Sequence, residues 1–440
     1  MKSPLNNYKK VASYEAQVGQ VKKCVLLYSG GLDTSVMLKW IQDEYKCEVI
    51  ALTIDVGQQA DDLKAIEQKA IMLGAVKAIV IDAKKEFAEE YIVPAIKANG
   101  SYQGDYHLST PIGRPLLSKL AVEIAEQEGA DAIAHGCTGK GNDQVRLEAS
   151  ALCYNPNIKI IAPVREWAMG RKEELLYAKQ NNIPVTHTLS KPYSYDDNMW
   201  GISAEGGVIE DPTQIIPLED VLQVCKTPEN APDIKTMIDI EFEKGVPVAI
   251  NNEKMELVDL IQSLNIIGAT HAIGVTVHIE DRLVGLKIRD VYEHPGAHMI
   301  ISAHKDLEKI VCTQDENEFK TIIDQKWAYL CYNAKWLEPT MSHLNSYIND
   351  VNDKVTGKVT LSLYKGVVTT EAINSPYSIF NHALATFEKS DAYNQNASPG
   401  FIEIHSLAMK TVASKANKKS LPHNLKIYEK AMAKKQQVQA

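Results

Sequence analysis

The stretch "SGGLDTS", residues 29–35, has the residue types of a phosphate-binding turn, because it follows the apolar run "CVLLY" and opens an amphipathic segment. A strand that turns into a helix points unpaired backbone N–H groups and a positive helix end at one spot, which favours an anion. Two glycines let the main chain approach that anion and three hydroxyls add donors: Gly30, Gly31, Ser29, Thr34 and Ser35. Asp33 would either cap the helix or hold Mg²⁺ against the phosphates.

A second polar stretch, "AHGCTGKGNDQVR" at residues 134–146, contains glycines and a lysine but fits neither familiar nucleotide motif. A P-loop around Lys140 would need glycine where the chain has Ala134, and serine or threonine where it has Gly141. A dinucleotide fingerprint would need a third glycine where the chain has Gln144. The sequence therefore indicates neither a P-loop enzyme nor a nicotinamide enzyme. By itself, "TGKGND" is also typical of a glycine-rich surface turn.

The elements that would position these stretches alternate from Lys22 to about Val185. Short apolar runs ("CVLLYS", "EVIALTIDV", "AIVIDA", "DAIAHG" and "IKIIAP") are separated by helix-period segments such as "DTSVMLKWIQDEY" and "DDLKAIEQKAIML". This βαβ rhythm predicts an α/β fold with a parallel sheet covered on both faces. Ligands of such sheets bind beyond the carboxyl ends of the strands, so the loops after Tyr28, Ile54 and Ala134 are expected to lie close together.

Beyond residue 185 the pattern changes, which predicts a domain boundary there. Residues 190–217 are expected to be rich in loops, and residues 236–375 mix alternating and helical segments, which predicts an α+β domain. In "LPHNLKIYEKAMAKK", one apolar stripe of Leu425, Tyr428 and Met432 predicts a helix that packs on its own chain or docks on another subunit. The predicted organisation is a flexible leader over 1–20, a nucleotide-binding domain over 21–185, a synthetase and multimerisation domain over 186–392, and a C-terminal arm over 393–440.

The composition is that of a soluble protein with several domains: 440 residues, 45% hydrophobic and 23% charged. No apolar run approaches the roughly 20 residues of a membrane span, and the polar first 21 residues do not read as a secretory signal. The seven cysteines are odd in number and never in C-x-x-C spacing, which favours buried thiols in a reducing cytoplasm.

The net charge of −9 argues against a protein whose main task is to neutralise nucleic acid. From Lys410 to the end, however, eight lysines face the single acid Glu429. This basic tail is either a solvated segment or an RNA-binding arm.

Six motifs occur in one order along the chain: "LYSGGLDTS" (27–35), "TIDVGQ" (53–58), "AHGCTGKGNDQVR" (134–146), "APVREW" (162–167), "SYDDNMWGIS" (194–203) and "IEDRLVGLKIRDVYE" (279–293). With them the chain from about Val21 to Leu407 resembles the argininosuccinate synthases, a family of N-type ATP pyrophosphatases. "GKGNDQVR" is specific to that family, whereas the glycine loop is shared with other adenylating enzymes.

The resemblance implies an adenine nucleotide alpha hydrolase-like N-terminal domain, an α+β synthetase domain and a C-terminal oligomerisation helix. It implies a cytoplasmic, Mg²⁺-dependent homotetramer that uses ATP to join citrulline and aspartate through a citrullyl-adenylate, in arginine biosynthesis. Neither membrane nor nucleic acid is expected as a partner. The same adenylating core leaves two alternatives, an RNA-modifying enzyme and a nucleotide-binding paralogue without turnover.

The resemblance also assigns residues to each substrate. ATP would be bound by the glycine loop, with Asp33 also supporting Mg²⁺, and by two further positions: Leu27, Tyr28, Ser29, Gly30, Gly31, Leu32, Asp33, Thr34, Ser35, Ile54 and Gly136. Aspartate would be bound by Thr138, Asn142 and Asp143. Citrulline would be bound by Tyr106, Thr110, Asn142, Arg146, Ser194, Ser203, Glu280 and Tyr292. Because four of these follow residue 185, the site is expected between the two domains.

The chain departs from the family pattern at four positions. Leu27 replaces a common alanine, and Pro111 occupies the place of a hydroxyl residue, whose role Thr110 would take. Ile288 and Asp290 replace a serine and a glycine in the segment before Tyr292. The end of the site that binds citrulline is therefore expected to differ from the family pattern.

Overall fold

The computed structural model describes residues 8–59, 62–167, 169–184, 192–388, 392–415 and 430. Two compact units divide the chain, Met1–Ile379 and Phe380–Ala440. The predicted boundary near residue 185 and the predicted helix around residues 425–432 lie outside the described residues, apart from Lys430.

The first unit begins with the predicted parallel sheet. Its strands are β1 (Lys23–Leu27), β2 (Glu48–Asp55), β3 (Lys77–Asp82), β4 (Ala132–Ala134) and β5 (Lys159–Ile161). They are ordered β3-β2-β1-β4-β5 and every neighbouring pair is parallel. All five strands coincide with the apolar runs of the sequence, which confirms the predicted α/β fold.

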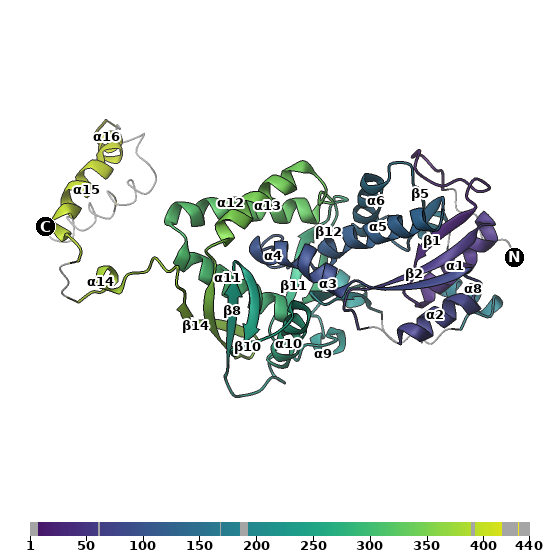
Figure 1. Cartoon of the computed structure of the whole chain (residues 1–440), viewed down its shortest axis with the longest axis horizontal. Helices are drawn as coiled ribbons and strands as arrows, with labels where there is room; N and C mark the ends of the chain where they lie inside the picture. The colour runs from purple at the N-terminus through teal and green to yellow at the C-terminus, as the bar shows by residue number, and fades with distance from the viewer. Residues whose placement is uncertain are drawn as a thin grey trace. The chain divides into compact units, whose positions relative to one another are not determined.

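Side chains that alternate along these strands divide between two cores. Leu26 and Ala51 pack with α1 (Leu32–Tyr45), α2 (Leu63–Met72) and α8 (Arg171–Gln180). Val25 and Leu52 pack with α5 (Ser109–Gln127) and α6 (Asp143–Tyr154) on the other face. The short helices α3 (Lys84–Glu86), α4 (Val93–Lys97) and α7 (Pro163–Glu166) and the π-helix Phe87–Ile92 complete this part. The sheet is therefore covered on both faces, as Figure 1 shows.

The chain reverses direction across the sheet at β1. It runs from β1 to β2 and β3 on one side, then crosses to β4 and β5 on the other. The loops that follow β1 and β4 therefore flank a topological switch point, where open α/β sheets bind their ligands.

The segment predicted as a flexible leader makes ordered contacts in its second half. Glu15 forms a parallel bridge with Ile160 of β5, and the Ala16 backbone N–H donates to the Ile160 carbonyl at 2.9 Å. Ala16 is buried, and Lys10 lies 3.1 Å from Glu166. Residues 8–20 therefore extend the edge of the nucleotide-binding part.

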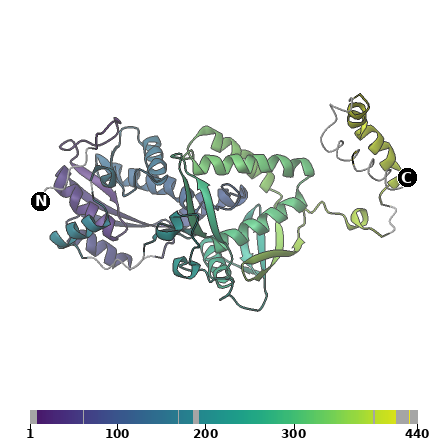
Figure 2. The ribbon, with the colours of Figure 1, turned by 180° about the vertical axis from the view of Figure 1, so that it is seen from behind.

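The described part of the rest of the first unit holds two antiparallel sheets, five α-helices and the 3-10 helix Gly207–Glu210. One sheet is ordered β10-β9-β8-β13-β14, with β8 at Thr236–Glu243, β9 at Val246–Ile250, β10 at Glu253–Lys254, β13 at Gly357–Tyr364 and β14 at Val367–Asn374. The other is ordered β11-β12-β7-β6, with β6 at Ser194–Asn198, β7 at Gly201–Glu205, β11 at Val275–Asp281 and β12 at Lys287–Glu293. The helices are α9 (Leu218–Val221), α10 (Leu257–Thr270), α11 (Pro295–Val311), α12 (Gln314–Tyr332) and α13 (Pro339–Asn352), seen from behind in Figure 2.

The expectation of loops over residues 190–217 was wrong where β6 and β7 form a hairpin. The polar residues of "SYDDN" suggested a loop, but they occupy a strand whose one face lines a pocket. The α+β prediction for residues 236–375 is confirmed by the strands and helices of that region.

One hydrophobic core joins the parallel sheet to the later elements. Val25 and Leu116 belong to the same buried cluster as Phe242, Trp327 and Leu363. The face of the parallel sheet that α5 covers is therefore part of a core completed by residues more than 200 positions later.

The second unit contributes three described helices, α14 (His382–Ala385), α15 (Ser398–His405) and α16 (Leu407–Lys415), and the 3-10 turn Gln395–Ala397. Its large apolar side chains are exposed: Phe380, Leu384, Phe387, Tyr393, Phe401, Ile402, Ile404, Leu407, Met409 and Val412. Within the described ranges of the whole chain, no helix is both long enough and apolar enough to span a membrane.

The seven cysteines are all free thiols. Five are buried as expected, namely Cys24, Cys47, Cys225, Cys312 and Cys331, while Cys137 is half-buried and Cys153 is exposed. The expectation of buried thiols was therefore wrong for Cys153, which lies near the end of α6.

Candidate active site

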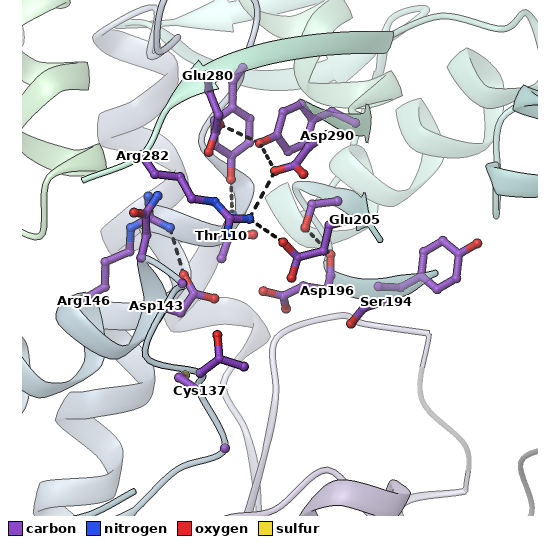
Figure 3. A pocket seen from close by; sticks show the side chains of 18 of the residues that line it. Thr110, Cys137, Asp143, Arg146, Ser194, Asp196, Glu205, Glu280, Arg282 and Asp290 are labelled. Atoms are coloured by element: carbon purple, nitrogen blue, oxygen red, sulfur yellow. Dashed lines mark hydrogen bonds and ion pairs between the residues drawn. The ribbon is translucent and has the colours of Figure 1, made fainter. Parts of the chain in front are cut away.

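A pocket of about 290 Å³ lies where the loops after β1 and β4 meet one face of the β11-β12-β7-β6 sheet. Figure 3 shows side chains from both parts pointing into it. Its walls are Asp33, Tyr106, Thr110, Gly136, Cys137, Thr138, Gly141, Asn142, Asp143, Arg146, Ser194, Tyr195, Asp196, Ser203, Glu205, Glu280, Arg282, Asp290 and Tyr292.

The loop after β1 has the geometry of an anion site. Gly30 adopts φ +79°, which a residue with a Cβ rarely does, and the extended Gly31 is the N-cap of α1. No side chain among the described residues caps α1, so its first backbone N–H groups remain available. The hydroxyls of Ser29 and Thr34 lie 3.1 Å apart beside them, whereas Ser35 donates back to the Gly31 carbonyl at 2.6 Å.

Asp33 does not cap this helix, so that interpretation was wrong. Gly31 takes the N-cap position, and Asp33 lies in the first turn, where it accepts a hydrogen bond from Arg171 at 2.9 Å. Burial and the neighbouring Asp33 raise the pKa of Glu174 to about 8.

No group of three or more metal-ligating side chains occurs in the part of the chain described. A single carboxylate fits a metal carried by nucleotide phosphates, because Mg²⁺ commonly uses one or two carboxylates plus phosphate oxygens.

The loop after β4 leads into α6, whose first turn carries three of the predicted residues. Asn142 is the N-cap residue, and the Asp143 carboxylate accepts hydrogen bonds from Arg146 at 2.9 Å and from Arg114 of α5 at 2.7 Å. Burial alone would raise the pKa of Asp143, but the two guanidinium groups outweigh it and lower the pKa. Arg114 also pairs with Asp196 of β6. Asp143 is thus a carboxylate kept ionised at the N-terminal end of α6.

The antiparallel sheet supplies the opposite wall through simple alternation. Tyr292 of β12 pairs with Ser203 of β7, and Ser203 pairs with Asp196 of β6, so these side chains share one face. On that same face lie Ser194, Glu205, Glu280 and Asp290. Strand β11 has the reverse of the usual burial pattern, because its polar residues His278 and Glu280 are buried while its apolar residues Val277 and Ile279 are exposed.

Glu280 lies at the centre of a tyrosine cluster. It is 3% exposed, and its two oxygens accept hydrogen bonds from Tyr292 at 2.7 Å and Tyr332 at 2.6 Å. The ring of Tyr106 stacks on Tyr292 with centroids 4.0 Å apart. Burial, together with the neighbouring tyrosine and carboxylates, raises the pKa of Tyr292 well above its usual value, so its hydroxyl stays a donor.

Tyr332 of α12 connects this cluster to α6. Its hydroxyl accepts from the Asn142 amide at 2.8 Å, and its carbonyl accepts from Arg146 at 3.1 Å. The Arg146 guanidinium also lies 4.7 Å from the centroid of the Tyr332 ring. Arg146 is 4% exposed, yet its Nη2 and the Asn142 Oδ1 have no hydrogen-bond partner among the described residues. Such orphaned buried groups are typical of a site that a ligand completes.

At the far end of the pocket, two carboxylates share one arginine. Arg282 pairs with Glu205 and lies 3.8 Å from Asp290. Figure 3 shows both acids beside it. Burial, and then the charges of Glu280 and Glu205, raise the pKa of Asp290 to about 8.

The structure brings together every residue predicted for aspartate and citrulline, including Thr110, whereas Pro111 and Ile288 do not line the pocket. Of the residues predicted for ATP, only Asp33 and Gly136 line it; the others lie on β1, on the glycine loop and α1, or, for Ile54, buried in β2. The sequence did not single out Arg114, Asp196, Glu205, Arg282 or Tyr332. Asp196 and Glu205 lie on strands whose alternation is concealed by polar side chains, and no local signal marks Arg114 or Tyr332.

Comparisons with known proteins agree with this arrangement. The family model described as Arginosuccinate synthase N-terminal HUP domain matches residues 23–184, and the model described as Arginosuccinate synthase C-terminal domain matches residues 193–412. The argininosuccinate synthase of Symbiobacterium thermophilum is 47% identical over 89% of this chain and 98% of its own length. That of Halalkalibacterium halodurans is 47% identical over 90% of this chain and 96% of its own.

A solved structure of the U34-tRNA thiolase NcsA from Methanococcus maripaludis is 18% identical over 41% of this chain and 61% of its own. Its TM-score of 0.25 is too low to support a structural argument. The two family models, in contrast, cover most of the chain, and the argininosuccinate synthases match nearly their full length. The chain belongs to the argininosuccinate synthase family, and it is an ATP-using ligase of arginine biosynthesis.

Proposed function

We propose that this enzyme condenses L-citrulline with L-aspartate through a citrullyl-adenylate and releases AMP and pyrophosphate. One observation carries the proposal: a single pocket contains both predicted amino-acid sets, next to Asp33 and Gly136 of the predicted ATP site. Citrulline must reach the α-phosphate of ATP, and the amine of aspartate must then reach the ureido carbon of the adenylate, so the two amino-acid sites have to share one cavity.

In the first step, the ureido oxygen of citrulline bonds to the α-phosphorus while the bond to pyrophosphate breaks. The N–H groups at the start of α1 and the hydroxyls of Ser29 and Thr34 would neutralise the phosphate charge. Asp33 would support Mg²⁺ bound to the nucleotide, which supplies further charge neutralisation.

In the second step, the amine of aspartate bonds to the ureido carbon while the bond from that carbon to AMP breaks. The ionised Asp143 suits recognition of the amino group, and Thr138 and Asn142 suit the carboxylates. Arg114 and Arg146 hold Asp143 from both sides, so its orientation is set before substrates bind.

The test is AMP and pyrophosphate release from ATP with citrulline and aspartate supplied singly and together. We expect full release only with both, and argininosuccinate as the product. Release that does not depend on citrulline would contradict the proposal.

We further propose that the enzyme is a cytoplasmic homotetramer whose C-terminal arm contacts other subunits. The support is the row of exposed apolar residues from Phe380 to Val412, which a stable monomer would not leave in water. Light scattering should give four chains for the full protein and fewer for a chain that ends at Ile379. A full-length monomer would contradict this proposal.

A further inference from the structure

Asp290 is a pocket residue without an assigned role. It lies on β12, is 6% exposed and lines the pocket beside Glu280 and Tyr292. Its Oδ2 is 3.3 Å from the Tyr292 hydroxyl, which donates chiefly to Glu280, and its Oδ1 has no hydrogen-bond partner among the described residues. An ionised carboxylate in such surroundings is costly unless a cation joins it.

The carboxylates around Asp290 outnumber the cations among the described residues. Among the described residues, the charged groups that act on it are Glu280 of β11, Glu205 of β7 and the cation Arg282. Tyr292 and His278, its register partner on β11, lie beside it as well. Arg282 is already paired with Glu205. Two of the three carboxylates therefore share this guanidinium, and Glu280 is bound by tyrosine hydroxyls instead. This end of the pocket is complementary to a positively charged group.

The geometry of the reaction places the ammonium group of the substrate at this end. The ureido group must face the nucleotide, whose predicted contacts in this pocket are Asp33 and Gly136. Figure 3 shows Cys137, which follows Gly136, on the opposite side of the pocket from Glu280 and Asp290. Citrulline bound with its ureido group near Gly136 therefore extends its amino-acid end towards the carboxylates.

We propose that Asp290 is a second carboxylate, beside Glu280, that binds the α-ammonium group of citrulline and selects for it; this inference rests on the proposed function. Both oxygens of Glu280 already accept tyrosine hydroxyls, whereas the Oδ1 of Asp290 has no hydrogen-bond partner among the described residues, so Asp290 supplies the acceptor that is still free. A carboxylate and an ammonium group form a charge-assisted hydrogen bond, which a neutral side chain cannot replace.

Binding of citrulline is expected to change the protonation of Asp290. Burial and the neighbouring carboxylates raise the pKa of Asp290 to about 8 in the free pocket, so it is largely protonated at pH 7. An incoming ammonium group favours the ionised form and lowers that pKa. Binding of citrulline at pH 7 should therefore release a proton to the buffer.

The first experiment compares the near-isosteric Asp290→Asn with the wild type. We expect the KM for citrulline to rise about tenfold to a hundredfold, the range of one hydrogen bond to a charged group, with the KM for ATP unchanged. The matched control is Asp281→Asn, which removes the same charge from an exposed residue at the end of β11 that pairs with Lys287. The control should leave both KM values unchanged.

The second readout separates ammonium binding from a structural role. The analogue 5-ureidopentanoate lacks the α-amino group, so the wild type should bind it much more weakly than citrulline. In Asp290→Asn that preference should shrink about tenfold or more, because the lost interaction is the one that the analogue lacks. An unchanged preference would overturn the proposal even if the variant were less active.

The third readout needs no variant and holds if Asp290→Asn fails to fold. Calorimetric titration of the full chain with citrulline, in the presence of a non-hydrolysable ATP analogue, is done at pH 7 in two buffers of different ionisation enthalpy. Proton release supports the proposal and its absence overturns it. If the wild type forms no AMP with citrulline and aspartate, the proposed function itself has failed; if it does, the result for Asp290 stands alone.

Discussion

We expect Asp143→Asn to weaken the use of aspartate strongly while the adenylation of citrulline continues. The carboxylate is the first acid of α6 and accepts hydrogen bonds from Arg114 at 2.7 Å and Arg146 at 2.9 Å. Asparagine keeps the shape and one acceptor oxygen but loses the charge. The arginines would stay near their places, while the group that recognises the amine of aspartate would become neutral.

The expected losses of activity and of stability can be worked out from the contacts of Asp143. One hydrogen bond between charged groups contributes about 1.5–3 kcal/mol, so kcat/KM for aspartate should fall about tenfold to a hundredfold or more. Folding should suffer less than the 3–5 kcal/mol of a fully buried broken pair, because the Asp143 side chain is 25% exposed. We expect about 1–2 kcal/mol of destabilisation, within the range of a partly exposed pair.

The assay measures exchange of labelled pyrophosphate into ATP with citrulline alone, then argininosuccinate formation with both substrates. Asp143→Asn should retain exchange, while the kcat/KM of product formation with respect to aspartate falls by the factor given above. The control is Asp43→Asn, since Asp43 is a half-exposed partner of Lys39 on the outer surface of α1. An unchanged KM for aspartate in Asp143→Asn would refute the assignment, and loss of both reactions would show that Asp143 serves the first step as well.

Three further predictions concern the loops after β1 and β4. Gly30→Ala should cost about 1–2 kcal/mol of stability and weaken ATP binding, because φ is +79° and the new Cβ would lie 3.0 Å from Ile66; unfolding curves and ATP titration check this. Burial opposes the charge of His135, but Cys137 and Glu148 raise its pKa to about 9, above the usual 6.5. The folded state therefore holds a proton that the unfolded chain loses, so the free energy of unfolding should fall as pH rises from about 6.5 to about 9, and His135→Gln should flatten that slope. In a Cys153→Ser background, ATP with citrulline should slow alkylation of the pocket residue Cys137, and equal rates with and without them would contradict its place in the pocket.

The parallel sheet could be predicted from the sequence because its strands are short apolar runs, and the central strands β1, β2 and β4 are buried on both faces. "EVIALTIDV" and "AIVIDA" are nearly unbroken apolar runs. Short runs of this kind are typical of strands in a parallel sheet that is covered by helices. The hairpin at residues 194–205 could not be predicted in this way, because the side chains that line the pocket are polar and conceal the alternation of the strands.

The candidate site was predictable where its residues lie within recognisable motifs. Asn142, Asp143 and Arg146 share one turn of α6, so finding the motif finds all three. Arg114 lies inside α5 and Tyr332 is the last residue of α12, and both contact the site through tertiary packing alone. No spacing rule connects a tyrosine at the end of α12 to the first turn of α6, because that contact depends on the whole fold.

The core shared by the parallel sheet and the later elements has a consequence for biosynthesis on the ribosome. The face of the sheet that packs α1 can close once residues up to about 183 have been made. The opposite face belongs to a cluster that includes Trp327 and Leu363, so it stays unfinished until these residues leave the exit tunnel. During that interval the nascent chain exposes apolar surface, and chaperones would protect it most effectively if they bound the α5 side of the sheet.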